Sequence, residues 1–271
     1  MNYRHSFHAG NFADLVKHAL VLWLVKTRAA AGPMTVLDTH AGAGLYDLSG
    51  DAARSKEAEV GVARLMTDAD LPPLMQALAD RVAALNSDGG ARFYPGSPVL
   101  IADALGSEGR YVGYELNPPV LALLDQALAE RPNAGVREGD GYTLATAEAA
   151  RAKAPLILID PPFEKPDDYI RSAEAALAVI RRDPAATIAV WTPLKDLETF
   201  DAFTRRLEGR AGPTLVAEAR LRPLTNPMKM NGCALVIVNP PPGAEDAARQ
   251  VCGWVADCLG DPGGRAEIWS F

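Results

Sequence analysis

A carboxylate, two prolines and an aromatic ring follow an apolar run in the middle of the chain, where LILIDPPF ends in Asp160, Pro161, Pro162 and Phe163. The carboxylate of Asp160 and the carbonyl held between the prolines can accept both hydrogens of a planar exocyclic amine. The lone pair of the amine nitrogen is otherwise delocalised into the ring, and these two hydrogen bonds direct it toward a methyl donor. Positioning of the substrate would then supply most of the rate acceleration of methyl transfer. Phe163 can stack on a base taken out of its helix. The pattern favours methyl transfer to such an amine.

Three further acidic residues follow predicted strands: Asp38 in VLDTHAGAG, Glu115 in YVGYE and Asp140 in EGDGY. A carboxylate at the C-terminal end of a strand can accept two hydrogen bonds from a ribose diol, and open α/β sheets bind their ligands beyond those ends. The small residues at 41–44 let the backbone approach a ligand closely. A simple strand-end cap would explain any one of these acids. Three in succession favour a nucleotide-like cofactor.

The elements that must position these residues alternate along the chain. Continuously apolar runs, typical of buried parallel strands, alternate with amphipathic stretches at 119–130 and 167–182, whose apolar residues recur every three or four positions. This alternation predicts a doubly wound α/β sheet. Strands are predicted at 34–38, 110–115, 134–138, 155–160, 186–192, 214–221 and 233–239, and AEIWS at 266–270 is a candidate for one more.

Two segments interrupt the alternation. A helix is predicted to begin after Asn11, whose side chain can cap free amide groups, and to run to about Arg28. The stretch 49–106 holds no convincing strand, and its apolar spacing predicts helices around 57–66 and 71–85. We therefore expect a single domain over 1–271 that carries a small helical insertion at 49–106.

Composition bounds the class of protein. The net charge is -7 and the pI is about 5.2, so any nucleic-acid site must be local, and the basic segments 1–30 and 204–230 are the candidates. The longest early apolar run, 19–25, is far shorter than the ~20 residues that cross a bilayer. Three cysteines form no disulfide framework, and no secretory leader precedes the first helix. We expect a cytoplasmic protein without a membrane segment.

Other classes of function remain open on the residues alone. His5 and His8 have H-x-x-H spacing, and His18 and His40 could complete the ligand set of a metal-dependent hydrolase. The glycine-rich loop also permits a nicotinamide dehydrogenase, although DPPF has no role there. A second motif, NPPP at 239–242, lacks the aromatic fourth residue, and we interpret it as a turn that ends a strand.

The motifs also resemble a known family. DPPF, together with an acidic glycine-rich loop after the first strand, resembles the S-adenosylmethionine-dependent amino-methyltransferases, and the Asp in first position resembles their adenine-N6 branch. The opening YRHSFHAGNFADLVKH, followed in order by LDTHAGAG, YPGSP and DPPF, is similar to the bacterial 23S ribosomal RNA adenine-N6 methyltransferases of the RlmJ family. The similarity runs from Tyr3 to about residue 240.

The resemblance implies a class I methyltransferase fold with a seven-stranded, mostly parallel sheet, S-adenosylmethionine as cofactor and 23S ribosomal RNA as partner. We also expect a monomer without a metal ion. Two positions depart from the family: Phe163 replaces an expected Tyr, and Phe12 stands where a further histidine is common. For the cofactor, the resemblance implies contacts with His18, His40, Ser97 and Asp160, ribose binding by Glu115, and contact of its adenine end with Asp140 and Gly141. For the substrate, it implies that Asp160 accepts a proton near the target amine, that Phe163 stacks on the base and that Tyr3 contacts the RNA.

Overall fold

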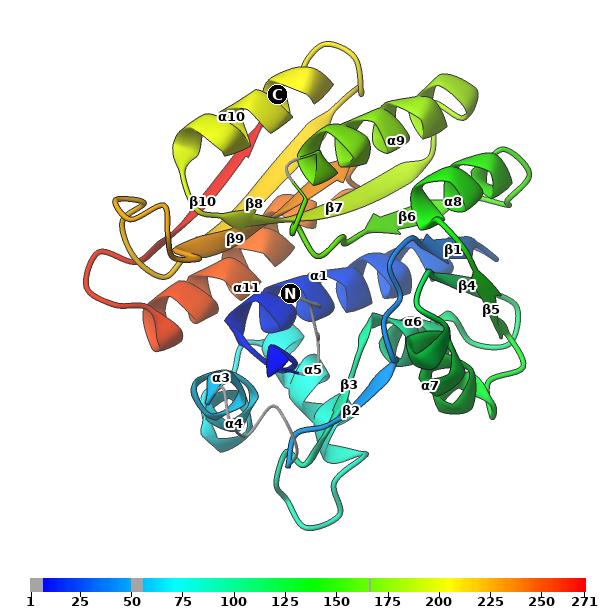
Figure 1. Ribbon diagram of the computed structural model, residues 1–271. Helices are drawn as coiled ribbons and strands as arrows, with labels where there is room; N and C mark the ends of the chain where they lie inside the picture. Colours follow the sequence, from blue (N-terminus) through cyan, green and yellow to red (C-terminus); the bar gives the residue numbers. More distant parts are fainter. Residues whose placement is uncertain (1–6, 50–55, 166) are drawn as a thin grey trace.

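The computed structural model describes residues 7–49, 56–165 and 167–271, which fold around one central eight-stranded sheet (Figure 1). From one end of the sheet to the other, the strands are β5 (Ala134–Glu138), β4 (Arg110–Glu115), β1 (Thr35–Asp38), β6 (Leu156–Ile159), β7 (Thr187–Leu194), β9 (Gly232–Val238), β8 (Thr214–Arg220) and β10 (Arg265–Ser270).

Five neighbouring strands, from β5 to β7, pair in parallel, whereas β9 is antiparallel to both β7 and β8, and β10 is antiparallel to β8. The strands β1, β4, β5, β6, β7 and β8 therefore all end at one side of the sheet, which we call the carboxyl edge. The seven predicted strands are confirmed. The count of seven is wrong, because the C-terminal AEIWS segment pairs with β8 along its length and adds an eighth strand.

Helices cover both faces of the sheet. The helices on one face are α8 (Gly141–Ala149), α9 (Asp168–Arg182) and α10 (Leu197–Leu207). The helices on the other are α1 (Phe12–Ala29), α5 (Pro73–Ala83), α6 (Ser97–Leu105), α7 (Pro118–Leu128) and α11 (Ala244–Leu259). Each face has its own apolar core, as expected for a sheet whose strands are buried on both sides.

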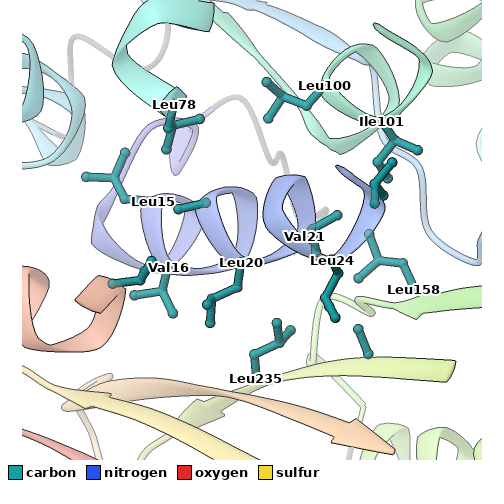
Figure 2. Close-up of a cluster of buried hydrophobic side chains, with 14 of the residues drawn as sticks. Leu15, Val16, Leu20, Val21, Leu24, Leu78, Leu100, Ile101, Leu158 and Leu235 are labelled. Atoms are coloured by element: carbon teal, nitrogen blue, oxygen red, sulfur yellow. The ribbon is translucent and has the colours of Figure 1, made fainter. Parts of the chain in front are cut away.

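The predicted first helix is confirmed as α1, and it lies inside the protein. The Asn11 side chain accepts hydrogen bonds from the amides of Ala13 and Asp14 and so caps the helix. Nearly every residue up to Val25 is buried, as a helix that is apolar all round requires. Figure 2 shows its side chains between the sheet and the outer helices, in contact range of Leu78, Leu100, Ile101, Leu158 and Leu235. Polar groups on α1 are therefore buried as well.

The segment between β1 and β4 contains more than helices. It holds β2 (Leu45–Asp47), α3 (Glu57–Val60), α4 (Val62–Thr67), α5, β3 (Phe93–Pro95) and α6. The expectation that 49–106 contains no strand is wrong, because β3 pairs antiparallel with β2. Strands of three residues are too short to show a periodic pattern. The extent of the insertion as a separate subdomain stays a prediction.

Backbone packing explains why the helix predicted at 57–66 is observed as α3 and α4, broken at Gly61. A Cβ on Gly61 would lie 2.2 Å from the carbonyl oxygen of Gly10, so the insertion packs directly on the backbone that leads into α1. Within the described part of the chain, no helix is both long and apolar enough to cross a membrane.

Candidate active site

The acidic residues predicted to cluster do meet at the carboxyl edge. In the sheet register Asp38 pairs with Gly113 of β4 and with Leu158 of β6. Glu115 lies two residues after Gly113, and Asp160 lies two residues after Leu158. The ends of three adjacent strands therefore bring Asp38, Glu115 and Asp160 together. The crevice beyond such ends is the usual ligand site of an open α/β sheet.

Glu115 closes the glycine-rich loop that follows β1. Its carboxylate accepts hydrogen bonds from the amides of Gly42 (3.2 Å) and Asn117 (2.8 Å). Gly42 has a φ of +67°, and a Cβ there would lie 2.5 Å from the hydroxyl oxygen of Tyr46, so the loop requires glycine at this position. A carboxylate has about four acceptor sites, and Glu115 therefore retains acceptor capacity for a ligand.

Asp140 and Gly141 form the start of α8, close to the same loop. The Asp140 side chain accepts a hydrogen bond from the amide of Tyr142 (3.1 Å) and pairs with Arg171 (2.5 Å). A Cβ on Gly141 would lie 1.9 Å from the carbonyl oxygen of Thr39, so α8 approaches the loop after β1 as closely as backbone can. Asp140 thus lies beside the loop, as predicted.

Asp38, the last residue of β1, is fully buried. Its carboxylate accepts hydrogen bonds from the hydroxyls of Ser97 (2.8 Å) and Tyr111 (3.1 Å). Burial raises the pKa of Asp38 to about 6, and the nearby charge of Asp160 adds to the rise, while the two hydrogen bonds oppose it. The structure therefore uses the Ser97 hydroxyl to hold Asp38.

The two histidines predicted to contact a cofactor have different surroundings. His18 is 1% exposed, and its Nδ1 lies 2.8 Å from the hydroxyl oxygen of Tyr94. His40 lies in the loop after β1, where Nδ1 is 2.7 Å from the hydroxyl oxygen of Thr39 and the ring meets Tyr142 edge-on at 4.6 Å. Burial lowers the pKa of His40 to about 4, so its ring is neutral at neutral pH.

Asp160 forms an ion pair with a lysine of α1. The Lys17 ammonium lies 2.6 Å from Asp160 and 2.9 Å from Asp14, and Asp14 also accepts the amide hydrogen of Gly10 (3.0 Å). Burial alone would lower the pKa of Lys17, but the two carboxylates outweigh it and raise the pKa well above the ordinary value. The Lys17 charge is therefore permanent at physiological pH, and it fixes the position of the Asp160 carboxylate.

Phe163 belongs to a group of aromatic rings beside this ion pair. The ring centroid of Phe163 lies 4.5 Å from that of Tyr169 and 5.8 Å from that of Trp191. The Lys17 ammonium lies 6.0 Å from the centre of the Trp191 ring. Phe163 has a φ of +49°, a backbone conformation rare for a bulky residue, which is commonly held at functional sites. An aromatic surface therefore adjoins the Asp160 carboxylate.

The second proline motif lies at the opposite edge of the sheet. Asn239 follows β9, which is antiparallel to β7, and its side-chain amide donates to the carbonyls of Pro184 (2.8 Å) and Ala186 (2.7 Å) just before β7 begins. These contacts fit the interpretation of NPPP as a turn that ends a strand.

The surroundings of His8 are relevant to the alternative of a metal-dependent hydrolase. His8 lies 3.0 Å from the Glu57 carboxylate, and no group of three potential ligands occurs in residues 7–49, 56–165 and 167–271. Tyr3 and His5 lie outside the described residues.

Ion pairs partly neutralise both basic segments within the protein. Lys17 is buried against carboxylates, and Arg220, 7% exposed, pairs with Glu218 and Glu267. Arg222 pairs with Asp261 at 2.7 Å.

Sequence reasoning overlooked the chemical importance of Asp14 and Lys17, and of the rings of Tyr169 and Trp191. Asp14 and Lys17 carried a usable signal, since they are opposite charges three residues apart in a stretch, 12–25, whose other residues are apolar except for His18. The two rings carried no such signal, because apolar aromatics in a helix and a strand are typical of any core.

Known proteins resemble this chain over nearly its whole length. The family described as "Ribosomal RNA large subunit methyltransferase D, RlmJ" matches residues 31–271. The chain belongs to the RlmJ family. It is 31% identical to ribosomal RNA large subunit methyltransferase J of Escherichia coli (strain K12), over 99% of this chain and 98% of that protein. It is 30% identical to the protein of the same name from Haemophilus influenzae, over 96% and 94% of the two chains.

A crystal structure of a Legionella pneumophila protein has the same fold, with a TM-score of 0.88, 26% identity and coverage of 97% of this chain and 98% of that one. The mostly parallel sheet is thus the class I methyltransferase fold of the RlmJ family, with one strand more than expected. Membership of this family disfavours the hydrolase and dehydrogenase alternatives.

Proposed function

We propose that this RlmJ-family chain transfers a methyl group from S-adenosylmethionine to the exocyclic N6 amine of a specific adenine in 23S ribosomal RNA. The observation that carries the proposal is the DPPF loop, where Lys17 holds the Asp160 carboxylate beside the Phe163 ring, at the edge where Glu115 closes a glycine loop. A DNA adenine is the alternative substrate.

The residues at the carboxyl edge fit the cofactor. Glu115 keeps acceptor capacity for the two ribose hydroxyls, and the side-chain-free backbone at Gly42 permits close approach. Asp140 and Gly141 would lie at the adenine end, and His40 would contact the cofactor as a neutral ring. His18 and Ser97 are also proposed contacts: the Ser97 hydroxyl donates to Asp38 but can still accept a hydrogen bond, and His18 uses only its Nδ1 toward Tyr94.

Each group of the DPPF loop has a proposed task in the transfer. S-adenosylmethionine, when bound, supplies an electrophilic methyl group on a positively charged sulfur. Asp160 and the carbonyl of Pro161 accept the two amine hydrogens, which aims the N6 lone pair at that methyl carbon. Methylation leaves N6 positively charged, and Asp160 accepts the proton that N6 then loses. Phe163 stacks on the adenine ring, and Tyr3 would contact the RNA.

The test is methylation of ribosomal RNA from cells that lack RlmJ activity, with a labelled methyl donor and mapping of the modified base. We expect label at N6 of one adenine of 23S RNA, loss of labelling in Asp160→Ala, and retention in Asn239→Ala. Label found only in DNA would overturn the choice of substrate, and the reverse behaviour of the two variants would overturn the choice of motif.

We also propose that the chain acts in the cytoplasm as a monomer without a metal ion. Light scattering and metal analysis of the purified protein test this. A stable dimer or stoichiometric zinc would contradict it.

A further inference from the structure

The connection between β8 and β9, residues 221–231, is held rigidly at its base. Asn231 is fully buried, and its side-chain amide donates to the carbonyls of Lys195 (2.9 Å) and Asn226 (2.8 Å). Its backbone amide donates to Leu194 (2.9 Å), and its carbonyl accepts from Leu221 (2.9 Å). We call residues 221–231 the β8–β9 loop; it extends at the left of Figure 1.

The β8–β9 loop lies at the same edge of the sheet as Asp160. Gly232, which follows the loop, pairs with Leu194 at the end of β7 and with Arg220 at the end of β8. Strand β7 also carries Trp191, whose ring contacts Phe163, and Pro193, whose carbonyl accepts from the hydroxyl of Tyr169 (3.0 Å). The end of β7 therefore connects the loop to the aromatic rings beside the DPPF motif.

The tip of the loop presents an apolar side chain to solvent. Met228 is 91% exposed, more than any other large hydrophobic residue in the described part of the chain. A turn built on Asn226 holds it in place, because the Asn226 side chain accepts the Met228 amide hydrogen (3.1 Å) and the Asn226 carbonyl accepts that of Lys229 (3.1 Å). An isolated exposed methionine is ordinary, whereas one on a braced turn at the sheet edge that also carries Asp160 is a candidate contact for the substrate.

The charges around Met228 match a nucleic acid. Lys229 is exposed next to it, and Lys195 is exposed at the end of β7, where its carbonyl anchors the loop. The adjacent acid, Asp196, is engaged in capping α10 through the Thr199 amide (2.8 Å). Lys229 on the loop and Lys195 beside its anchor are thus exposed cations at this edge, and such side chains can bind the phosphates of an RNA backbone.

We propose that Met228 enters the RNA base stack and fills the gap that the target adenine leaves when it turns out toward Asp160. Apolar side chains, methionine among them, are inserted between base steps by proteins that deform nucleic acids. Taking a base out of its stack costs a few kcal/mol, and an apolar side chain in the vacated space restores part of the lost stacking. This inference rests on the proposed function and assigns a residue that opens the substrate.

The experiment compares two RNAs that carry the mapped adenine: a strand annealed to its complement, and the same strand alone. Met228→Ala should lower the methylation rate on the duplex about tenfold and leave the rate on the single strand within about twofold, because only the duplex requires base extrusion. Met228→Leu, which keeps an apolar side chain of similar size, should stay near wild type. Leu123→Ala, an exposed apolar truncation on α7, is the matched control.

A second measurement reports the extrusion itself. With 2-aminopurine in place of the target adenine in the duplex, wild-type protein should raise the fluorescence as the base unstacks, and Met228→Ala should raise it less. Equal rates and equal fluorescence for Met228→Ala and wild type would overturn the proposal, as would an equal loss on both RNAs. Wild-type protein that methylates neither RNA would refute the proposed function itself, and this inference with it.

Discussion

Two proline motifs, DPPF and NPPP, follow apolar strands in this chain, and the structure places them at opposite edges of one sheet. Asp160 follows β6 and meets a buried lysine and an aromatic group, whereas Asn239 follows β9 and bonds the carbonyls of Pro184 and Ala186. The local sequences are similar, but their surroundings differ in charge and in neighbours.

The difference teaches that strand direction decides what such a motif can do. β6 is parallel to β1, so its end meets the glycine loop and the other acidic strand ends. β9 is reversed relative to β7, so its end lies at the edge where the parallel strands begin, whereas open α/β sheets bind their ligands at the opposite edge. A strand-end motif is thus a candidate site only when its strand ends at the carboxyl edge.

The largest expected effect separates the two motifs. Asp160→Ala should lower the methylation rate about 10³-fold, because the amine loses the group that orients it and accepts its proton. Initial rates with a labelled methyl donor measure this loss. Asn239→Ala should instead leave the rate intact and lower the free energy of unfolding by about 1–2 kcal/mol through lost carbonyl bonds. Equal rate losses in both variants would remove the distinction between the edges.

A second test addresses the lysine that only the first motif has. Lys17→Met should lower the methylation rate about 100-fold and the free energy of unfolding by about 3–5 kcal/mol, because Asp14 and Asp160 lose the cation buried between them. Denaturant unfolding and initial rates measure the two effects. Lys26→Met, on the exposed side of the same helix, should match wild type within about 0.5 kcal/mol. An unchanged stability of Lys17→Met would show that the ion pair contributes nothing net.

The free energy of unfolding should also depend on pH, because burial at the carboxyl edge lowers the pKa of His40 from 6.5 to about 4. The unfolded chain binds a proton at His40 below pH 6.5, whereas the folded chain resists it until about pH 4. Folding stability from this group is therefore lost as pH falls through that window, by about 2–3 kcal/mol. The pKa of Asp38 is raised to about 6, so its contribution to folding stability has the opposite pH dependence and is lost as the pH rises.

Urea unfolding of wild type and His40→Gln between pH 4 and pH 7 measures the His40 contribution. The difference in free energy between the two proteins should narrow as the pH falls. Parallel pH profiles would show that His40 titrates in the folded protein as it does in the unfolded chain.

The smallest expected effect concerns the cofactor side of the edge. Glu115→Gln should weaken S-adenosylhomocysteine binding about tenfold, because a charged acceptor for the ribose hydroxyls becomes neutral. Calorimetry measures this, and Glu138→Gln, at the end of the neighbouring β5, is the matched control. Similar affinities for the two variants would remove Glu115 from the ribose site.

The main strands and α1 were predictable because their signals are local. Buried parallel strands are continuously apolar over four or more residues, and α1 has a capping Asn11 before a long apolar run. β2 and β3 were missed because three-residue strands have no period, and their pairing joins segments far apart in the chain. The break at Gly61 was missed because it depends on the backbone of Gly10.

By itself, the sequence determined the α/β class and the acids that follow the strands, because residue type and periodicity carry these. Only the tertiary structure decided that Lys17 neutralises Asp160, that Ser97 holds Asp38, and that Asn239 lies at the far edge. Those facts depend on contacts between residues 53 to 143 positions apart in the chain and on strand direction, which no local pattern encodes.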